Sequence, residues 1–246
     1  MSTIALDTDH LSPPRRPPGR AQGYHRWSDL LFIHWRLPAE AVAALLPPGL
    51  TLDTWQGDAW VGLVPFRMSG VRPWWSPWGV AFPETNVRTY VQWEGRDPGV
   101  WFFSLEASHR LAVSIARAGW GLNYHHARMK VTRRRNHVRY ESRRTADGGV
   151  VCDIEARVDE ASFYAQPYTL EHFLIERYVL YTRSGAGRLF RGRVHHERYR
   201  LQAARLLHLD ESLLAANGIQ RSGSPDHVVA CGDVDVEIFP LAPGIK

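Results

Sequence analysis

The stretch FPETNVRTYVQW at residues 82–93, followed by the turn EGRDPG at 94–99 and the segment VWFFSLEA at 100–107, decides the predicted fold. In the first segment Val87, Thr89, Val91 and Trp93 alternate with polar side chains, as on a strand that presents two different faces. Glycine and proline in the turn, and the aromatic run after it, predict an antiparallel partner strand. The two segments are therefore predicted to form a clear antiparallel pair.

The rest of the chain continues in hairpin order, with about ten strands separated by turn residues. Short helices are predicted over 38–46, 108–118, 169–176 and 201–216. No parallel β-α-β rhythm and no repeat is visible. The predicted fold class is therefore mainly β (α+β), a curved antiparallel sheet or barrel with a few short helices on its outside. Residues 1–23, rich in Pro, Arg, Ser and Gly, predict a disordered arm, and residues 24–246 a single domain.

Composition argues against nucleic acid and membrane as partners. The net charge of +5 is small and spread along 246 residues, and its densest run, Arg133–Arg135, predicts a solvated hairpin turn. The chain contains no secretory signal pattern and no apolar run of roughly 18 residues, so a soluble, cytoplasmic protein is expected. Cys152 and Cys231 lie in apolar strand patterns and predict buried free thiols.

Several motifs of known chemistry are absent from the sequence. It contains no glycine-rich nucleotide loop, no G-x-S-x-G, no H-E-x-x-H and no C-x-x-C, so no cofactor and no metal site is predicted. The pairs His125-His126 and His195-His196 lie in strand patterns, where neighbours point to opposite faces and cannot share one metal. A site drawn from different strands, for example His125 or His126 with His195, stays open.

Four stretches carry a resemblance to a known family: LPAEAVAALLPPGL at 37–50, AWVGLVPFRM at 59–68, FPETNVRTYV at 82–91 and FLIERYVLY at 173–181. In this order they resemble the YqjF-like bacterial family, which is related in fold to acetoacetate decarboxylase. The match runs from about Trp27 to Phe239. The resemblance implies a cone-shaped, largely antiparallel β-barrel that encloses a small-molecule pocket.

The resemblance also marks a departure from the decarboxylase. That enzyme forms a Schiff base on a lysine whose pKa is lowered by a second lysine beside it. The apparent counterpart here, GLNYHH at 121–126, contains no lysine, and Lys246 is terminal. Lys130 lies further along the next predicted strand and is a weak candidate for a displaced nucleophile. Schiff-base decarboxylation is therefore not the expected reaction.

Glu84 does carry over from the resemblance, which places it at the start of a pocket strand. Extended geometry puts Glu84, Asn86, Arg88 and Tyr90 on one polar face. This face is interpreted as a pocket floor that orients a polar ligand. The alternative is a Glu84–Arg88 ion pair on an exposed sheet face.

The predicted catalytic residues are Glu84 together with His125 and His126, which stand where the lysines would be. A structural hydrogen-bonding role is the alternative for both histidines. The predicted ligand-binding residues are Asn86, Arg88, Tyr90, Tyr124 and Arg177. For Arg177, a structural corner between helix and strand is the alternative.

Three functions stay open at this stage. The first is an enzyme that transfers protons on a small carboxylate or carbonyl compound. The second is a non-catalytic small-molecule-binding protein, and the third is a structural or partner-binding domain with a filled core. A tryptophan-rich loop at 72–80 favours a lidded pocket, and a homo-oligomer is compatible with the sequence.

Overall fold

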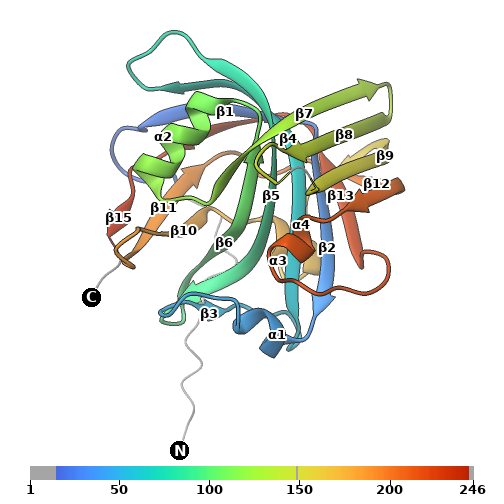
Figure 1. The fold of residues 1–246 in the computed structure, drawn as a ribbon, viewed down its shortest axis with the longest axis horizontal. Coiled ribbons are helices and arrows are strands. Elements are labelled where there is room, and N and C mark those ends of the chain that lie inside the picture. Colours follow the sequence, from blue (N-terminus) through green and yellow to red (C-terminus); the bar gives the residue numbers. More distant parts are fainter. Residues whose placement is uncertain (1–14, 148, 244–246) are drawn as a thin grey trace, which may run out of the picture.

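A computed structural model describes residues 15–147 and 149–243, which form 15 strands and four short helices (Figure 1). The helices are α1 (Ala39–Ala43), α2 (Arg110–Trp120), α3 (Leu170–Ile175) and α4 (Leu213–Ala216). The strands are β1 (Gly23–Ser28), β2 (Leu30–Leu37), β3 (Thr51–Leu52), β4 (Ala59–Pro73), β5 (Val80–Trp93), β6 (Arg96–Ala107), β7 (Tyr124–Arg134), β8 (His137–Arg144), β9 (Val151–Phe163), β10 (Val179–Arg183), β11 (Leu189–His195), β12 (Leu201–Glu211), β13 (His227–Cys231), β14 (Val234–Ile238) and β15 (Ala242–Pro243). The mainly β class with short helices is as predicted.

The strands pair into one curved sheet whose connections close into two circuits that share β4, β5 and β6. The first circuit runs on through β10, β11, β14 and β1, and the second through β7, β8, β9, β12, β13 and β2. The circuits separate because two long strands fork. The start of β4 pairs with β2 and its end with β1, while Val100 and Trp101 of β6 pair with β10 and its last residues with β7.

The shared strands separate two hydrophobic cores. Side chains alternate along a strand, so Phe66 and Tyr90 enter the first core, which also holds residues of β11 and β14. Leu63 and Val87 enter the second core, together with residues of β8 and β9. β5 is therefore a wall between two packed interiors, and its alternate residues belong to different ones.

Two predictions about the sheet are wrong. β6 pairs in parallel with both β7 and β10, so β6, α2 and β7 form a β-α-β unit within a mixed sheet. Alternation reports which residues share a face and carries no information on strand direction, so the pattern alone missed this unit.

The helix predicted over 201–216 is mostly the strand β12, and only Leu213–Ala216 is helical. The pairing of β12 with β9 is irregular between Gln202 and Ala204 and between Leu206 and His208. At the first irregularity the extra residues lie on β9, whereas the second inserts one residue into β12 and breaks its period of two. The apolar spacing along β12 consequently imitates a helix.

Other local predictions are confirmed: helices form within 38–46 and 169–176, a third begins within 108–118 and continues to Trp120, and the cysteines are buried free thiols. Of the predicted arm, residues 1–14 lie outside the described residues. The remainder packs on the domain, because Arg16 binds Glu237 at 2.6 Å and Ala21 is buried. No helix in the described chain is long and apolar enough to cross a membrane.

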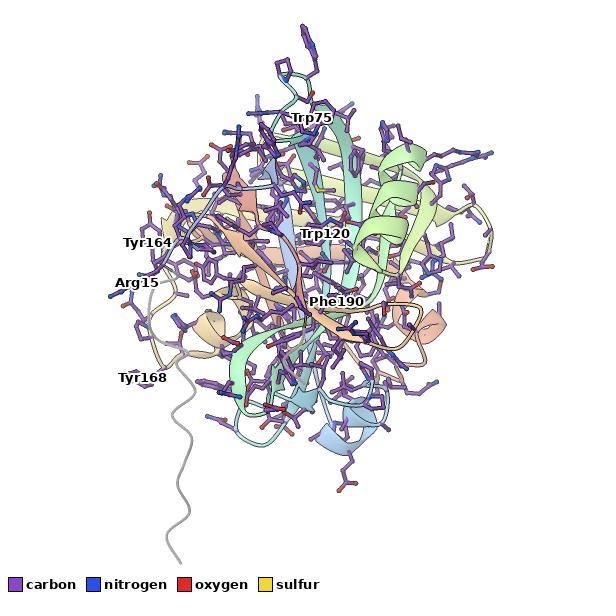
Figure 2. All side chains as sticks on the ribbon, turned by 90° about the vertical axis from the view of Figure 1, so that its left-hand side faces the viewer. Arg15, Trp75, Trp120, Tyr164, Tyr168 and Phe190 are labelled. Carbon is purple, nitrogen blue, oxygen red and sulfur yellow. The ribbon has the colours of Figure 1, made fainter. Side chains whose placement is uncertain are left out.

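The tryptophan-rich loop is the tip of the β4–β5 hairpin. Trp74, Trp75 and Trp78 are 42%, 69% and 83% exposed. Figure 2 labels Trp75 near the tip of this hairpin. In this conformation the loop extends into solvent.

Candidate functional site

Glu84 lies on β5 inside the first core, flanked by Phe66 of β4 and Ala107 of β6. Its side chain is buried, and the phenol of Tyr124 donates a hydrogen bond of 2.7 Å to Oε2. β7 supplies Tyr124 because it runs parallel to β6 in a register that sets this residue opposite Leu105. Two residues 40 positions apart thus form one buried acid–phenol pair.

Burial raises the pKa of Glu84 to about 8, and the nearby charge of Glu106 acts in the same direction. Hydrogen bonds from Tyr124 and Asn86 favour the ionised form and partly oppose this rise. At pH 7 the carboxyl group is therefore mostly neutral. A neutral carboxylic acid with a pKa near the ambient pH is suited to general acid catalysis.

Asn86 and Arg88 follow Glu84 on the same face of β5. Together with Tyr90 they form a row of side chains, called the Glu84 row below. The Oδ1 atom of Asn86 is buried and has no hydrogen-bond partner in the described chain. The Arg88 guanidinium donates to the carbonyl of Leu174 at 3.3 Å and lies 5.4 Å from the centre of the Phe32 ring. Among the described residues, no carboxylate lies within the 4 Å of an ion pair from Arg88. The half-buried guanidinium can therefore accept an anion, and the alternative of an exposed Glu84–Arg88 pair is not what this face shows.

Tyr90 ends the row and is held in place on two sides. Its hydroxyl donates to the carbonyl of Leu174 at 2.9 Å and also contacts Nε2 of His34 at 2.8 Å. A hydroxyl has one proton, so His34 Nε2–H donates to Tyr90, and His34 Nδ1 accepts from Nδ1–H of His227 at 3.0 Å. Burial lowers the pKa of both histidines, which agrees with two neutral rings. Tyr90 supports the site rather than offering a free group to it.

Replacing Tyr90 with Phe is expected to cost about 1–3 kcal/mol of stability, because two buried polar partners lose their hydrogen bonds. Urea denaturation measures this change. Tyr168→Phe is the matched control, since the Tyr168 side chain is exposed at 78% and should tolerate the loss of its hydroxyl. Equal stabilities of the two variants would contradict the deduced hydrogen-bond chain.

The two predicted histidines fall on opposite faces of β7. His126 lies opposite Ala107, on the face of Glu84, but its ring nitrogens contact Thr145 at 3.0 Å and the carbonyl of Ser108 at 3.2 Å. His125 lies opposite Glu106, on the other face. The structure therefore places Tyr124 in contact with Glu84, whereas the ring of His126 is hydrogen-bonded to Thr145 and Ser108.

Arg177 is buried at the corner between α3 and β10. Its Nη1 forms an ion pair of 2.7 Å with Asp53, and its Nε donates to the carbonyl of Phe173 at 2.7 Å. The guanidinium also lies 4.3 Å from the centre of the Phe173 ring. These contacts correspond to the structural alternative for this residue.

A buried ion pair behind Glu84 was not predicted. On the opposite face of β6, Oε1 of Glu106 accepts hydrogen bonds from Nε and Nη2 of Arg144 at 3.0 and 2.6 Å. Glu106 is 0% exposed, and its charge contributes to the raised pKa of Glu84. A carboxylate inside the apolar run VWFFSLEA was the signal that could have revealed it.

Two clefts of the described structure have volumes of about 430 and 380 Å³. Neither is lined by Glu84, Asn86 or Arg88. The second is lined by Lys130, which lies six residues beyond Tyr124 along β7 and so about 20 Å from it. Lys130 is thus too far from Glu84 to act there as a displaced nucleophile.

Solved structures with the same fold cover nearly the whole chain at low identity. The enduracididine biosynthesis enzyme MppR complexed with pyruvate is 14% identical, with a TM-score of 0.64, over 95% of this chain and 91% of that one. An acetoacetate decarboxylase-like enzyme from Sphingomonas wittichii RW1 is 12% identical, with a TM-score of 0.62, over 97% and 98%. These similarities show an acetoacetate decarboxylase-like fold.

Sequence similarity is much closer to one curated protein. The uncharacterized protein YqjF of Bacillus subtilis (strain 168) is 36% identical over 218 residues, which cover 87% of this chain and 89% of that protein. The DUF2071 family, described as an uncharacterized conserved protein, matches residues 24–235. The chain therefore belongs to the DUF2071 family, and it is YqjF-like in sequence and acetoacetate decarboxylase-like in fold.

Proposed function

We propose that this protein is an enzyme that binds a small carboxylate bearing a carbonyl group beside β5 and transfers a proton to it from Glu84. The observation that carries this proposal is the combination of a buried, mostly neutral Glu84 with a half-buried Arg88 that has no carboxylate partner in the described chain. An acid and an anion-binding group along one strand suit a molecule with a carboxylate at one end and a proton acceptor at the other.

Each residue of the row has a distinct role in this proposal. Arg88 binds the carboxylate. The Oδ1 atom of Asn86, which has no partner in the described chain, accepts a hydrogen bond from a hydroxyl group of the ligand or of its hydrated carbonyl. Glu84 protonates the carbonyl oxygen, while Tyr124 holds the carboxyl group in place through Oε2. No Schiff base is included, because the row contains no lysine. Pyruvate, the ligand named for the MppR complex, belongs to the proposed class.

A second candidate is a domain whose first core is filled by side chains and binds a partner instead of a substrate. This second candidate is favoured because Glu84 lines neither of the two clefts. A ligand at this row then requires side chains of the first core to move aside. Direct binding measurements separate the two candidates.

The test uses pyruvate and acetoacetate as probes in a thermal-shift assay. At about a hundred times its dissociation constant, a ligand adds about 2.7 kcal/mol, which corresponds to about 5–10 °C in a domain of this size. Arg88→Met is expected to abolish the shift, and Glu84→Gln to retain it relative to its own melting temperature. No shift with either probe, despite a cooperative melt, would favour the filled core.

Turnover is followed separately, as exchange of the methyl protons of pyruvate with D2O, observed by proton NMR. While Glu84 protonates the carbonyl oxygen, solvent water removes a methyl proton, which gives the enol. A deuteron from solvent then adds to that carbon as the enol oxygen returns its proton to the Glu84 carboxylate, and loss of a general acid typically costs about 10²–10⁴-fold. Glu84→Gln should lose the exchange by that factor. The control is Glu40→Gln, on the exposed side of α1, which should exchange like the wild type. Unchanged exchange in Glu84→Gln would remove the proposed role of Glu84.

A further inference from the structure

The tip of the β4–β5 hairpin is an exposed apolar surface. Every residue of 73–81 is exposed except Ser76, which is half-buried. The side chains of Trp74, Trp75 and Trp78 together expose an area on the order of 400–500 Å². An apolar patch of this size on a single chain is often a site of interaction with a protein or a membrane. Residues 73–81 are called the tryptophan tip below, and they have no role in the proposed proton transfer.

The tryptophan tip is held in one conformation by hydrogen bonds of its own. The backbone N–H of Trp74 donates to the carbonyl of Gln22 at 3.0 Å. Nη1 of Arg72 donates to the carbonyl of Ser76 at 3.1 Å, and the Ser76 hydroxyl donates to the carbonyl of Trp78 at 2.9 Å. These bonds fix the loop that carries the exposed rings. A partner therefore does not need to order the loop when it binds.

The surroundings of the tryptophan tip are cationic. The guanidinium of Arg20, an exposed residue, lies 3.3 Å from the centre of the Trp74 ring. Arg72 lies at the end of β4, directly before the tip. Among the described residues, neither arginine lies within 4 Å of a carboxylate. Residues 59–83, which span β4, the loop and the start of β5, contain no Asp or Glu. The tip therefore combines exposed aromatic rings with positive charge.

Acidic side chains on the neighbouring strands do not offset this charge. β1 pairs with the end of β4, and β14 pairs with β1. The carboxylates of β14 are bound to other arginines: Glu237 binds Arg16 at 2.6 Å, and Asp235 binds Arg26 at 3.0 Å. The positive charge beside the tip thus remains available to an anionic partner.

Charge and chemistry together favour a lipid surface over a second copy of this chain. A two-fold contact between two tips would bring the same cationic ends together, and like charges repel. A bilayer with anionic headgroups instead attracts each arginine near its surface. Tryptophan is enriched at the boundary between headgroups and acyl chains, because its ring has a large apolar body and one N–H donor. Composition did not predict a membrane partner, but a surface contact needs no spanning segment.

We propose that the tryptophan tip is a membrane-docking site, which inserts Trp75 and Trp78 at the headgroup level of a bilayer that contains anionic phospholipid. Arg20, beside Trp74, and Arg72, at the end of β4, supply the attraction for the lipid phosphates. The proposal is independent of the Glu84 row.

The test is sedimentation of the full chain with vesicles at low ionic strength. One set contains phosphatidylcholine with about 30% phosphatidylglycerol, and the other contains phosphatidylcholine alone. We expect binding to the mixed vesicles to be at least about tenfold tighter, and to weaken as salt is added, because salt screens the arginines. No sedimentation with the mixed vesicles, or equal binding to both sets, would overturn the proposal.

A double variant isolates the rings. Trp75→Ser combined with Trp78→Ser should weaken binding to the mixed vesicles at least about tenfold. Its melting temperature should match that of the wild type, because both side chains are exposed. Tyr168→Ser is the matched control, since Tyr168 is 78% exposed and Figure 2 labels it far from Trp75. The control should bind like the wild type. Equal binding of the double variant and the control would refute the docking site.

Sedimentation velocity without lipid tests the competing partner. A dimer that the double substitution dissociates, together with no binding to vesicles, would assign the tryptophan tip to a second copy and overturn the proposal. Glu84→Gln should bind vesicles like the wild type. Failure of this proposal is therefore distinguishable from failure of the proposed function.

Discussion

Glu84→Gln is expected to stabilise the protein, by about 3 kcal/mol at pH 7 and about 5 kcal/mol at pH 9. Burial raises the pKa of Glu84 from 4.5 to about 8, and each pKa unit corresponds to about 1.4 kcal/mol. Because the folded-state pKa is the higher one, the stability contributed by the protonated group is complete below pH 4.5 and is lost as the pH rises towards 8. A glutamine keeps the shape and has no proton to lose.

Urea denaturation of both proteins at pH 5, 7 and 9 measures this difference. The two curves of stability against pH should nearly meet at pH 5 and diverge above it. Glu40→Gln, at an exposed position on α1, should follow the wild type throughout. Parallel curves for Glu84→Gln and the wild type would mean that Glu84 titrates normally, which would take away the physical basis of its role as an acid. A residue that reduces stability at working pH is typical of a functional site.

Arg144→Met should destabilise the protein by about 3–5 kcal/mol at pH 7. Glu106 is fully buried, and Nε and Nη2 of Arg144 both donate to its Oε1. Removing one partner of a buried ion pair leaves an uncompensated charge, which costs more than the pair itself contributes. Chemical denaturation measures the loss.

Two further measurements identify the buried charge as the cause. Burial raises the pKa of Glu106, so the stability that depends on its protonated form is lost as the pH rises, and the defect of Arg144→Met should shrink at low pH. Adding Glu106→Gln should restore most of the stability at pH 7. Arg139→Met breaks an exposed pair with Asp153 and should change little. A defect in Arg144→Met no larger than that control would show that Glu106 is solvated.

The sequence predicted the row on β5 well because a strand alternates with a period of two. Glu84, Asn86, Arg88 and Tyr90 do share a face, and that face is an interior one. Alternation does not show whether a face is interior or exposed, or which residues of other strands contact it. The hydrogen bond from Tyr124 to Glu84 depends on the parallel register of β6 and β7, which α2 sets and no pattern within either strand records.

The rest of the site escaped prediction for related reasons. His125 and His126 differ by one position, so a strand start misjudged by one residue exchanges their faces. Arg177 was placed among ligand-binding groups, but its ion pair with Asp53 joins residues 124 positions apart and cannot be deduced from local spacing.

The double closure of the sheet has a consequence for synthesis on the ribosome. The second circuit is closed by β13, which pairs with β2, and the first by β14, which pairs with β1. At about 5–20 residues per second, the first two strands wait on the order of 10–40 s for partners that are translated last. During that interval the apolar strand LLFIHW at 30–35 has no β13 beside it. A chain released before residue 227 therefore keeps both interiors open and leaves the edge of β2 that pairs with β13 unpaired until translation is nearly complete.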